Sequence, residues 1–410
     1  MIALAAMALA LGVALGWRSA WAPAAGALGG VALSLLGGAA CSADMVAAAR
    51  ELWRPLVVIV GIMTITSCAA ELGVFARVAY WIEPRTRGPV RHGFRTVFAI
   101  AAVTAAVLSN DAAILLITPV VIELIRAVYP YRHPQLVVPF AFAAFVAAGV
   151  APLPTGNPMN LVVAEHAHIT ADAYALRMVP VAIAGWIVAY IMLAWCFRGV
   201  LADEKPAPGE APPSHPLGAH AKLVLAVTGA SVASYPVLAA LELPIWPIAA
   251  GAAVVCLATA VQAGVGVVPV ARNVSWELLP FVFGVLVLAT ALARAGATAQ
   301  LAELYAATPA PLATIGAVAA GGSALINNHP MALLHAHALE GAPTSHVLAA
   351  LVGGDLGPRL LPIGSLAGLL WMHALRRQGV VVPLRTFIRI GAIVTVPSLV
   401  VSLLVLWLVA

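Results

Sequence analysis

The sequence predicts an all-α polytopic membrane protein with two inverted repeats, about ten transmembrane helices, two re-entrant hairpins and two broken helices. Composition, an internal repeat and the placement of arginine predict this fold. Hydrophobic residues make up 63% of the 410 residues and charged residues only 9%, whereas roughly 25% of a soluble domain is charged. Apolar runs of about 20 residues, enough to cross a bilayer, recur along the chain. A separate soluble catalytic domain is therefore excluded, and no enzymatic activity is expected.

The first apolar run, residues 2–16, is expected to be a transmembrane span, because no basic segment precedes it as in a cleavable signal. The four cysteines have no metal-binding or disulfide spacing, so neither a metal nor a cofactor is expected. A net charge of +5 would favour nucleic acid as the partner of a soluble protein. Here the arginines lie in short loops between apolar runs, a placement that reports orientation in a lipid bilayer instead.

Two sets of landmarks recur in the same order in both halves of the chain. A tryptophan and two glycines with spacings of 8 and 12 occur twice, 223 residues apart: Trp53, Gly61 and Gly73, and Trp276, Gly284 and Gly296. A Pro-x-Gly and a later leucine recur with an offset of 208: Pro154, Gly156 and Leu161, and Pro362, Gly364 and Leu369. These matches predict one repeat over residues 1–197 and a second over residues 223–410, joined by a cytoplasmic linker over residues 198–222.

Arginine placement predicts that the two repeats have opposite orientations in the membrane. Residues 77–95 contain five arginines, whereas residues 297–310, at the corresponding place, contain no Lys or Arg. Because cytoplasmic loops are enriched in basic residues, these two loops are expected on opposite sides. Both chain termini are then outside, and the linker is inside.

Each repeat contains an apolar stretch with a polar break. In residues 94–126 the break is Ser109-Asn110-Asp111 and both ends are basic; in residues 311–340 the break is Asn327-Asn328-His329-Pro330 and neither end is basic. Each arm of about 16 residues rises only about 24 Å as a helix, less than the hydrocarbon core of about 30 Å. Each stretch is therefore predicted to be a re-entrant hairpin.

A broken helix is predicted after each hairpin. Residues 136–168 are interrupted by a polar segment over residues 152–158, and residues 345–375 by one over residues 355–365. Irregular backbone at membrane depth is tolerated where it is buried in protein or lines a cavity. The half-helix ends at all four breaks are expected to point their dipoles at a shared binding site.

The candidate site residues are the polar residues and glycines at these breaks. The candidate substrate-binding residues are Ser109, Asn110, Thr155, Gly156, Asn157, Asn160, Asn327, Asn328, His329, Gly354 and Ser365. The candidate proton- or cation-coupling residues are Asp111, Asp355 and Arg359. A membrane carboxylate that is left charged and unpaired costs about 2.5 to 3.5 kcal/mol, so each aspartate is expected to be protonated, paired or bound to a cation.

Structural roles are alternatives for some of these residues: helix capping for Ser109 and Ser365, compensation of a helix dipole for Asp111, and an ion pair for Asp355 with Arg359. Histidines near the second hairpin tip raise the question of a metal site. His335 and His337 lie two residues apart and would face different sides of a helix, so no metal site is expected.

Three segments, residues 108–119, 326–330 and 354–367, resemble the ArsB arsenite and antimonite efflux permeases. These belong to the ion transporter superfamily, together with NhaD sodium/proton antiporters and dicarboxylate/sodium symporters. The resemblance covers nearly the whole chain. It implies export of arsenite or antimonite, as a neutral trivalent hydroxide, in exchange for protons by an elevator-like movement in the bacterial inner membrane. It carries functional roles onto Asn110, Asp111, Asn327, Asn328 and Asp355.

The sequence departs from the family pattern at one position, and the resemblance does not decide whether two kinds of protein partner are present. Residues 147–151 are Ala-Ala-Gly-Val-Ala, where members of the family have an acidic residue, so one coupling carboxylate is missing. A cytoplasmic ATPase subunit and a second copy of the chain, as a homodimer, are the partners that it leaves open.

Two other transport functions fit the same architecture. A sodium/proton antiporter of NhaD type would use the Asn and Asp oxygens as hard cation ligands. An anion or dicarboxylate carrier would use the hairpin dipoles and Arg359, although Asp111 and Asp355 oppose an anion. An intramembrane aspartyl protease is disfavoured, because no second aspartate motif accompanies Asp111.

Overall fold

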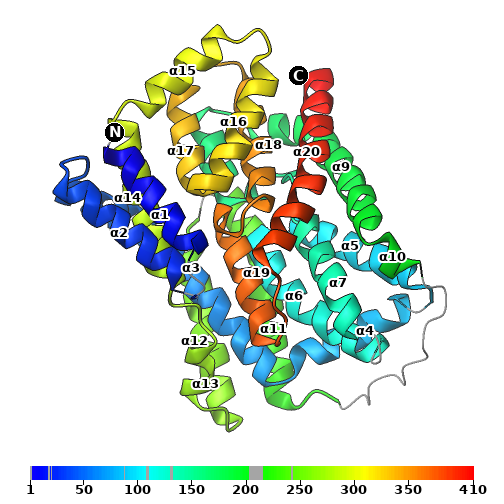
Figure 1. The fold of residues 1–410 in the computed structure, drawn as a ribbon. Coiled ribbons are helices and arrows are strands. Elements are labelled where there is room, and N and C mark those ends of the chain that lie inside the picture. The colour runs from blue at the N-terminus through cyan, green and yellow to red at the C-terminus, as the bar shows by residue number, and fades with distance from the viewer. Residues whose placement is uncertain are drawn as a thin grey trace.

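The computed structural model describes residues 2–16, 19, 21–86, 88–107, 110–129, 133–202, 216–241 and 243–410. All regular secondary structure in these residues is helical, which confirms the all-α fold class (Figure 1). The first half contains α1 (Ile2–Gly16), α2 (Ala22–Leu36), α3 (Ser42–Glu71), α4 (Val74–Thr86), α5 (Val90–Val107), α6 (Asn110–Val128), α7 (His133–Ala147), α8 (Pro158–His166), α9 (Ala171–Cys196) and α10 (Arg198–Leu201).

The second half contains α11 (Ala219–Ala240), α12 (Trp246–Gln262), α13 (Val267–Arg272), α14 (Leu278–Arg294), α15 (Ala297–Ala307), α16 (Pro311–Ile326), α17 (Asn328–Ala338), α18 (Thr344–Leu356), α19 (Leu366–Arg377) and α20 (Leu384–Val409). Three short 3₁₀ turns complete the secondary structure: η1 (Pro154–Gly156), η2 (Gly357–Arg359) and η3 (Pro362–Gly364).

Several of these helices are long and apolar enough to cross a bilayer. By length and composition, Leu52–Glu71 within α3, α9 and α20 each qualify alone, and α14 qualifies together with α15 across a bend of 64°. Shorter apolar helices, including α2, α12 and α16, account for much of the remaining hydrophobic sequence. The number of spans, the inversion of the repeats and the domain bounds stay predictions.

Two segments that the arginine placement predicts to be loops are largely helical. α4 occupies most of the first, residues 77–95, and α15 most of the second, residues 297–310. Each helix begins directly after a glycine with positive φ, Gly73 at 72° and Gly296 at 94°. Only glycine adopts this conformation without a steric penalty, so at these matched positions the chain turns sharply and a new helix starts.

The helices pack as two bodies. α1, α2, α3, α11, α12, α13 and α14 contact one another and form what we call the scaffold body. α5 to α10 and α16 to α20 form what we call the central body. α4 and α15 contact helices of both bodies, and in Figure 1 they lie at opposite ends of the molecule.

Within the scaffold body, two landmark glycines allow close helix packing. A Cβ at Gly61 of α3 would lie 2.9 Å from the carbonyl oxygen of Ala249 in α12, and one at Gly284 of α14 would lie 2.9 Å from the Cβ of Ala27 in α2. Such small-residue contacts let membrane helices approach closely. The matched glycines of the two halves therefore serve the same packing role.

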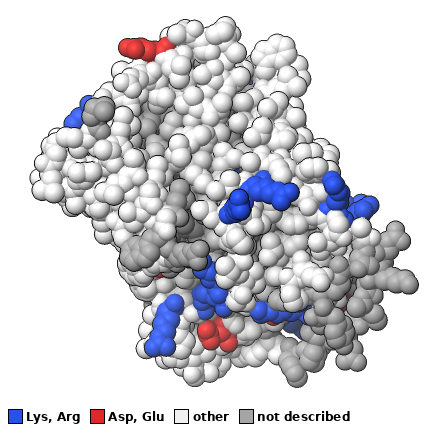
Figure 2. Space-filling model, in the orientation of Figure 1, with Lys and Arg blue, Asp and Glu red and all other residues white. Residues whose placement is uncertain are grey.

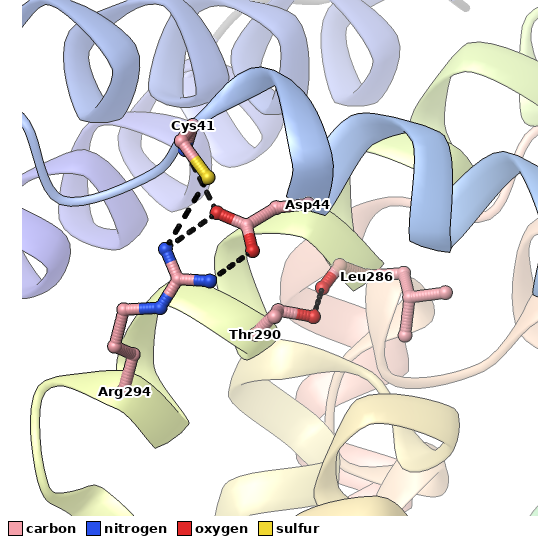
Figure 3. Close-up of polar contacts among 5 residues, drawn as sticks. All are labelled: Cys41, Asp44, Leu286, Thr290 and Arg294. Atoms are coloured by element: carbon pink, nitrogen blue, oxygen red, sulfur yellow. Dashed lines mark hydrogen bonds and ion pairs between the residues drawn. The ribbon is translucent and has the colours of Figure 1, made fainter.

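An ion pair joins the N-terminus of α3 to the C-terminus of α14 in the scaffold body. The Arg294 guanidinium faces the Asp44 carboxylate with both terminal nitrogens, and Nη1 lies 2.8 Å from Oδ2 (Figure 3). The same oxygen accepts the Cys41 N–H at 2.7 Å. Bidentate pairing of this kind fixes geometry as well as charge, so it ties the two helix ends together.

Basic side chains are unevenly distributed over the surface. On the face drawn in Figure 2, most Lys and Arg lie at mid-height or lower, whereas the top shows an acidic group and no basic one. The marked N- and C-termini both lie in the upper part of Figure 1, whereas α10, which precedes the linker, lies lower.

Candidate functional site

The two broken helices have the same local structure at their breaks. η1 is followed by Asn157, whose side chain caps α8 by accepting a hydrogen bond from Met159 N at 3.2 Å. η3 is followed by Ser365, which caps α19 by accepting from Gly368 N at 3.0 Å. The recurring Pro-x-Gly motif is therefore a 3₁₀ turn ahead of a capped helix in both halves. Ser365 has the structural role that the sequence left as an alternative.

Side chains from other segments satisfy the irregular backbone of the first break. Three carbonyls accept hydrogen bonds: Ala147 from Trp186 Nε1 (2.9 Å), Gly149 from Asn110 Nδ2 (3.1 Å) and Ala151 from Tyr174 Oη (3.2 Å). In the second half, Asn327 Nδ2 donates to the carbonyl of Ile363 at 3.0 Å. Asn110 and Asn327 thus each bind the break of the broken helix in their own half, and so supply partners to irregular backbone that would otherwise have none.

Asp355, at the end of α18, connects the two halves. Its carboxylate accepts hydrogen bonds from Ala151 N (2.9 Å), Asn157 Nδ2 (2.8 Å) and Asn160 Nδ2 (2.9 Å). The Asn160 amide also donates to Tyr174 Oη at 3.0 Å. Asp355 is only 5% exposed, and all three of its donors are neutral.

Arg359 and Asp355 line the same cavity, but the ion pair that their spacing in the sequence suggests is not formed. No contact between the two side chains occurs among the ion pairs of the described residues. Arg359 Nη2 instead donates to the carbonyl of Val146, while Nε and Nη1 have no partner within the described part of the chain. The physical reason is that α18 ends at Leu356 and the chain continues as η2, so the i, i+4 spacing no longer places both side chains on one helix face.

Candidate residues from all four breaks line one cavity of about 20 Å³. They are Asn110, Asn157, Asn328, Asp355, Arg359 and Ser365. A neighbouring cavity of about 10 Å³ shares Asn157 and Asn328 and adds Asn160 and Gly354. Each cavity has room for about one water molecule, so this conformation encloses a polar centre that is too small for a larger solute.

The remaining candidates lie elsewhere or outside the described residues. Thr155, Gly156 and His329 line neither of these cavities; His329 Nδ1 lies 3.0 Å from the Asn328 side-chain oxygen. Asn327 uses its side chain to cap α17 and to bind Ile363. Ser109 lies outside the described residues, and for Asp111 the structure describes only the backbone, in the first turn of α6.

Sequence reasoning missed three groups at this centre. Tyr174 is fully buried in an apolar helix, and its position gives no sign that it holds the Ala151 segment. Ala151 contributes its main-chain N–H. Every residue except proline carries this group, so the residue type does not indicate the role. Gly149 leaves space for Arg359, since a Cβ there would lie 2.5 Å from Arg359 Nη2. The only sequence feature that could have indicated this close approach is the presence of a glycine inside an apolar run.

A strongly apolar chain whose broken helices meet at a buried polar centre belongs to the class of polytopic membrane transporters. The sequence model of ArsB, described as arsenical pump membrane protein, matches residues 4–409. The chain belongs to this family, which confirms the resemblance first seen in three short segments.

Known relatives match along most of their length. An arsenical pump membrane protein of Escherichia coli is 30% identical over 415 residues, covering 96% of this chain and 93% of the relative. An uncharacterized transporter of Mycobacterium tuberculosis is 27% identical over 379 residues, covering 87% and 86%. The solved structure of the YdaH transporter of Alcanivorax borkumensis is 16% identical, covers 89% of this chain and 86% of that one, and gives a TM-score of 0.49.

Proposed function

We propose that this protein exports trivalent metalloid, as arsenite or antimonite, across the bacterial inner membrane in exchange for protons, and that the central body moves against the scaffold body as an elevator. The observation that carries the proposal is the cavity at which six candidate residues from all four breaks meet, in a chain of the arsenical pump family.

The charges around this cavity favour a neutral substrate. The carboxylate of Asp355 and the guanidinium of Arg359 balance formally, and the other candidate residues there are amides and a hydroxyl. A trivalent metalloid hydroxide is uncharged and offers O–H groups that both donate and accept hydrogen bonds. An anion would meet the Asp355 carboxylate, so the anion or dicarboxylate carrier is the weaker alternative.

The orientation of the asparagines argues against a sodium site. Asn157 and Asn160 turn their nitrogens toward Asp355, and the Asn157 oxygen is used to cap α8. Sodium requires oxygen ligands, as other hard cations do, and beside Asp355 these two amides present their nitrogens instead. Proton coupling fits better, because Asp355 can take up a proton without breaking an ion pair.

The packing of the helices supports an elevator. One apolar cluster centres on α1, α2 and α14 of the scaffold body and another on α9, α18 and α20 of the central body, while two further clusters pack α3, α11 and α12 against the central body. α4 and α15 link the bodies after a glycine turn. Rigid bodies joined by short hinged connections move relative to one another without repacking their cores.

Arsenite uptake by everted membrane vesicles, with and without an imposed proton gradient, tests the proposal. We expect uptake that requires the gradient, together with raised arsenite and antimonite tolerance in a pump-deficient host. Vesicles lacking the protein are the control. Unchanged metalloid tolerance with raised sodium or lithium tolerance would replace this function with that of a sodium/proton antiporter.

A further inference from the structure

A second, larger cavity lies where the two bodies meet. Its volume is about 80 Å³, several times that of the central cavity. α3 and the segment between α13 and α14 line it from the scaffold body, and α6 and α19 line it from the central body. It therefore lies on the boundary along which the bodies would slide.

The position of this cavity along α19 relates it to the central site. His373, in its wall, is eight residues beyond Ser365, the cap of α19, which corresponds to about 12 Å of helix rise. α19 ends with Arg376 and Arg377, and basic residues at a helix end mark the cytoplasmic side. The cavity therefore lies between the central site and the cytoplasm.

Two polar atoms in the cavity wall have no partner within the described part of the chain. They are the hydroxyl of Ser275, a residue only 1% exposed, and Nε2 of His373. A buried polar group without a hydrogen bond costs roughly 1 to 3 kcal/mol, so such atoms mark a place where a solute or water supplies the partner. Ser275 belongs to the scaffold body and His373 to the central body, so each body contributes one such atom to the cavity wall.

The charges near this cavity are compensated. His373 Nδ1 lies 3.3 Å from Glu277 Oε1. Burial of Glu277 acts to raise its pKa, but the hydrogen bond from His373 and the nearby Arg376 outweigh burial, so the pKa of Glu277 stays below its usual value. Arg377 also lines the wall, and Glu71 lies close enough to stabilise its charge. An uncharged solute with O–H groups fits this lining better than an ion.

We infer that this cavity is a cytoplasm-side binding station, at which the neutral metalloid hydroxide is held by Ser275 and His373 before it reaches the central site. The inference rests on the proposed function for the identity of the solute. Ser275 Oγ and His373 Nε2 bind the hydroxyls, while the apolar walls from Leu115 and Leu370 exclude excess water.

Kinetics of arsenite uptake in everted vesicles, whose outer face is the cytoplasmic one, tests the station. Ser275→Ala removes one partner. His373→Asn keeps a donor near the Nδ1 position for Glu277 and removes Nε2. Because each change deletes one hydrogen bond to the solute, we expect KM for arsenite to rise about three- to tenfold with kcat unchanged within about twofold. Ser34→Ala is the matched control, because Ser34 in α2 also has a buried hydroxyl without a partner but lies away from the cavity.

The outcomes separate this inference from the proposed function. If wild-type vesicles take up no arsenite, the proposed function fails and the station fails with it. If the wild type is active and both variants keep the KM of Ser34→Ala, the station alone is overturned. If His373→Asn fails to insert, Ala374→Leu replaces it, because a leucine at this position narrows the cavity without removing a hydrogen bond. A raised KM for arsenite in Ala374→Leu supports the station, and an unchanged KM contradicts it.

Discussion

Asn157 and Asp355 are 198 residues apart in the sequence, and a hydrogen bond of 2.8 Å joins them at the centre of the molecule. The Asn157 side chain caps α8 with its oxygen and binds the carboxylate with its nitrogen. One amide therefore fixes both the start of a helix in the first half and the position of an acid from the second.

Asp355→Asn is expected to abolish proton-driven transport while the protein still inserts. The amide keeps the shape but cannot accept three hydrogen bonds from neutral donors without turning its own NH₂ toward one of them, which costs roughly 1 to 3 kcal/mol of stability. Uptake in vesicles and thermal unfolding in detergent measure the two effects. Asp172→Asn, at an exposed position at the start of α9, is the control and should change neither.

Asp111→Asn is expected to insert normally and to lose transport driven by the proton gradient, as a coupling carboxylate requires. Uptake measured across a range of pH values checks this. Wild-type rates with an unchanged pH dependence would mean that Asp111 only compensates the dipole of α6 and that coupling resides elsewhere.

Tyr174→Phe is expected to lower kcat and to shift the pH profile of transport, because Asn160 and Ala151 both lose the hydroxyl that positions them around Asp355. A purely structural tyrosine would leave the pH profile in place. Tyr235→Phe is the matched control, because this buried tyrosine in α11 accepts a hydrogen bond from Ser231 and does not contact Asp355. The pH profile of transport by this variant should match that of the wild type.

Gly149→Ala is expected to displace Arg359, since the new Cβ would lie 2.5 Å from Arg359 Nη2. Overpacking of this kind typically costs about 1 to 3 kcal/mol, and the thermal midpoint should fall accordingly. Gly251→Ala in α12 meets no atom within 4 Å. It should leave the midpoint unchanged or raise it, because alanine is the better helix former.

The orientation of the repeats is tested by cysteine labelling in a background without the four native cysteines. Thr86 would be the natural choice within the arginine-rich segment, but it is only 1% exposed. Arg85→Cys and Ala306→Cys replace exposed residues of α4 and α15. We expect them to react with an impermeant reagent from opposite sides; reaction from the same side would contradict inversion.

The breaks in the helices were predictable from sequence because their residues carry local signals. Pro154 and Gly156, like Pro362 and Gly364, mark points at which a helix cannot continue regularly, and both pairs form 3₁₀ turns. Asn327, at the predicted tip of the second hairpin, has a positive φ of 78°, a backbone conformation that residues other than glycine adopt rarely.

The partners of the central acid were not predictable, because they depend on tertiary contacts. Ala151 uses its backbone N–H and Tyr174 is one aromatic residue among many apolar ones, so neither stands out in the sequence. The spacing of Asp355 and Arg359 suggested an ion pair, and the change from α18 to η2 removes the helical register on which that inference depends.

The contact between Asp355 and the first half also has a consequence for biosynthesis. Ribosomes add about 5 to 20 residues per second, so Asp355 emerges roughly 10 to 40 s after Asn157. During that interval Ala151 N and the amides of Asn157 and Asn160 lack the carboxylate that accepts their hydrogen bonds in the finished fold. These contacts of the first half therefore form only after the ribosome has delivered most of the second half.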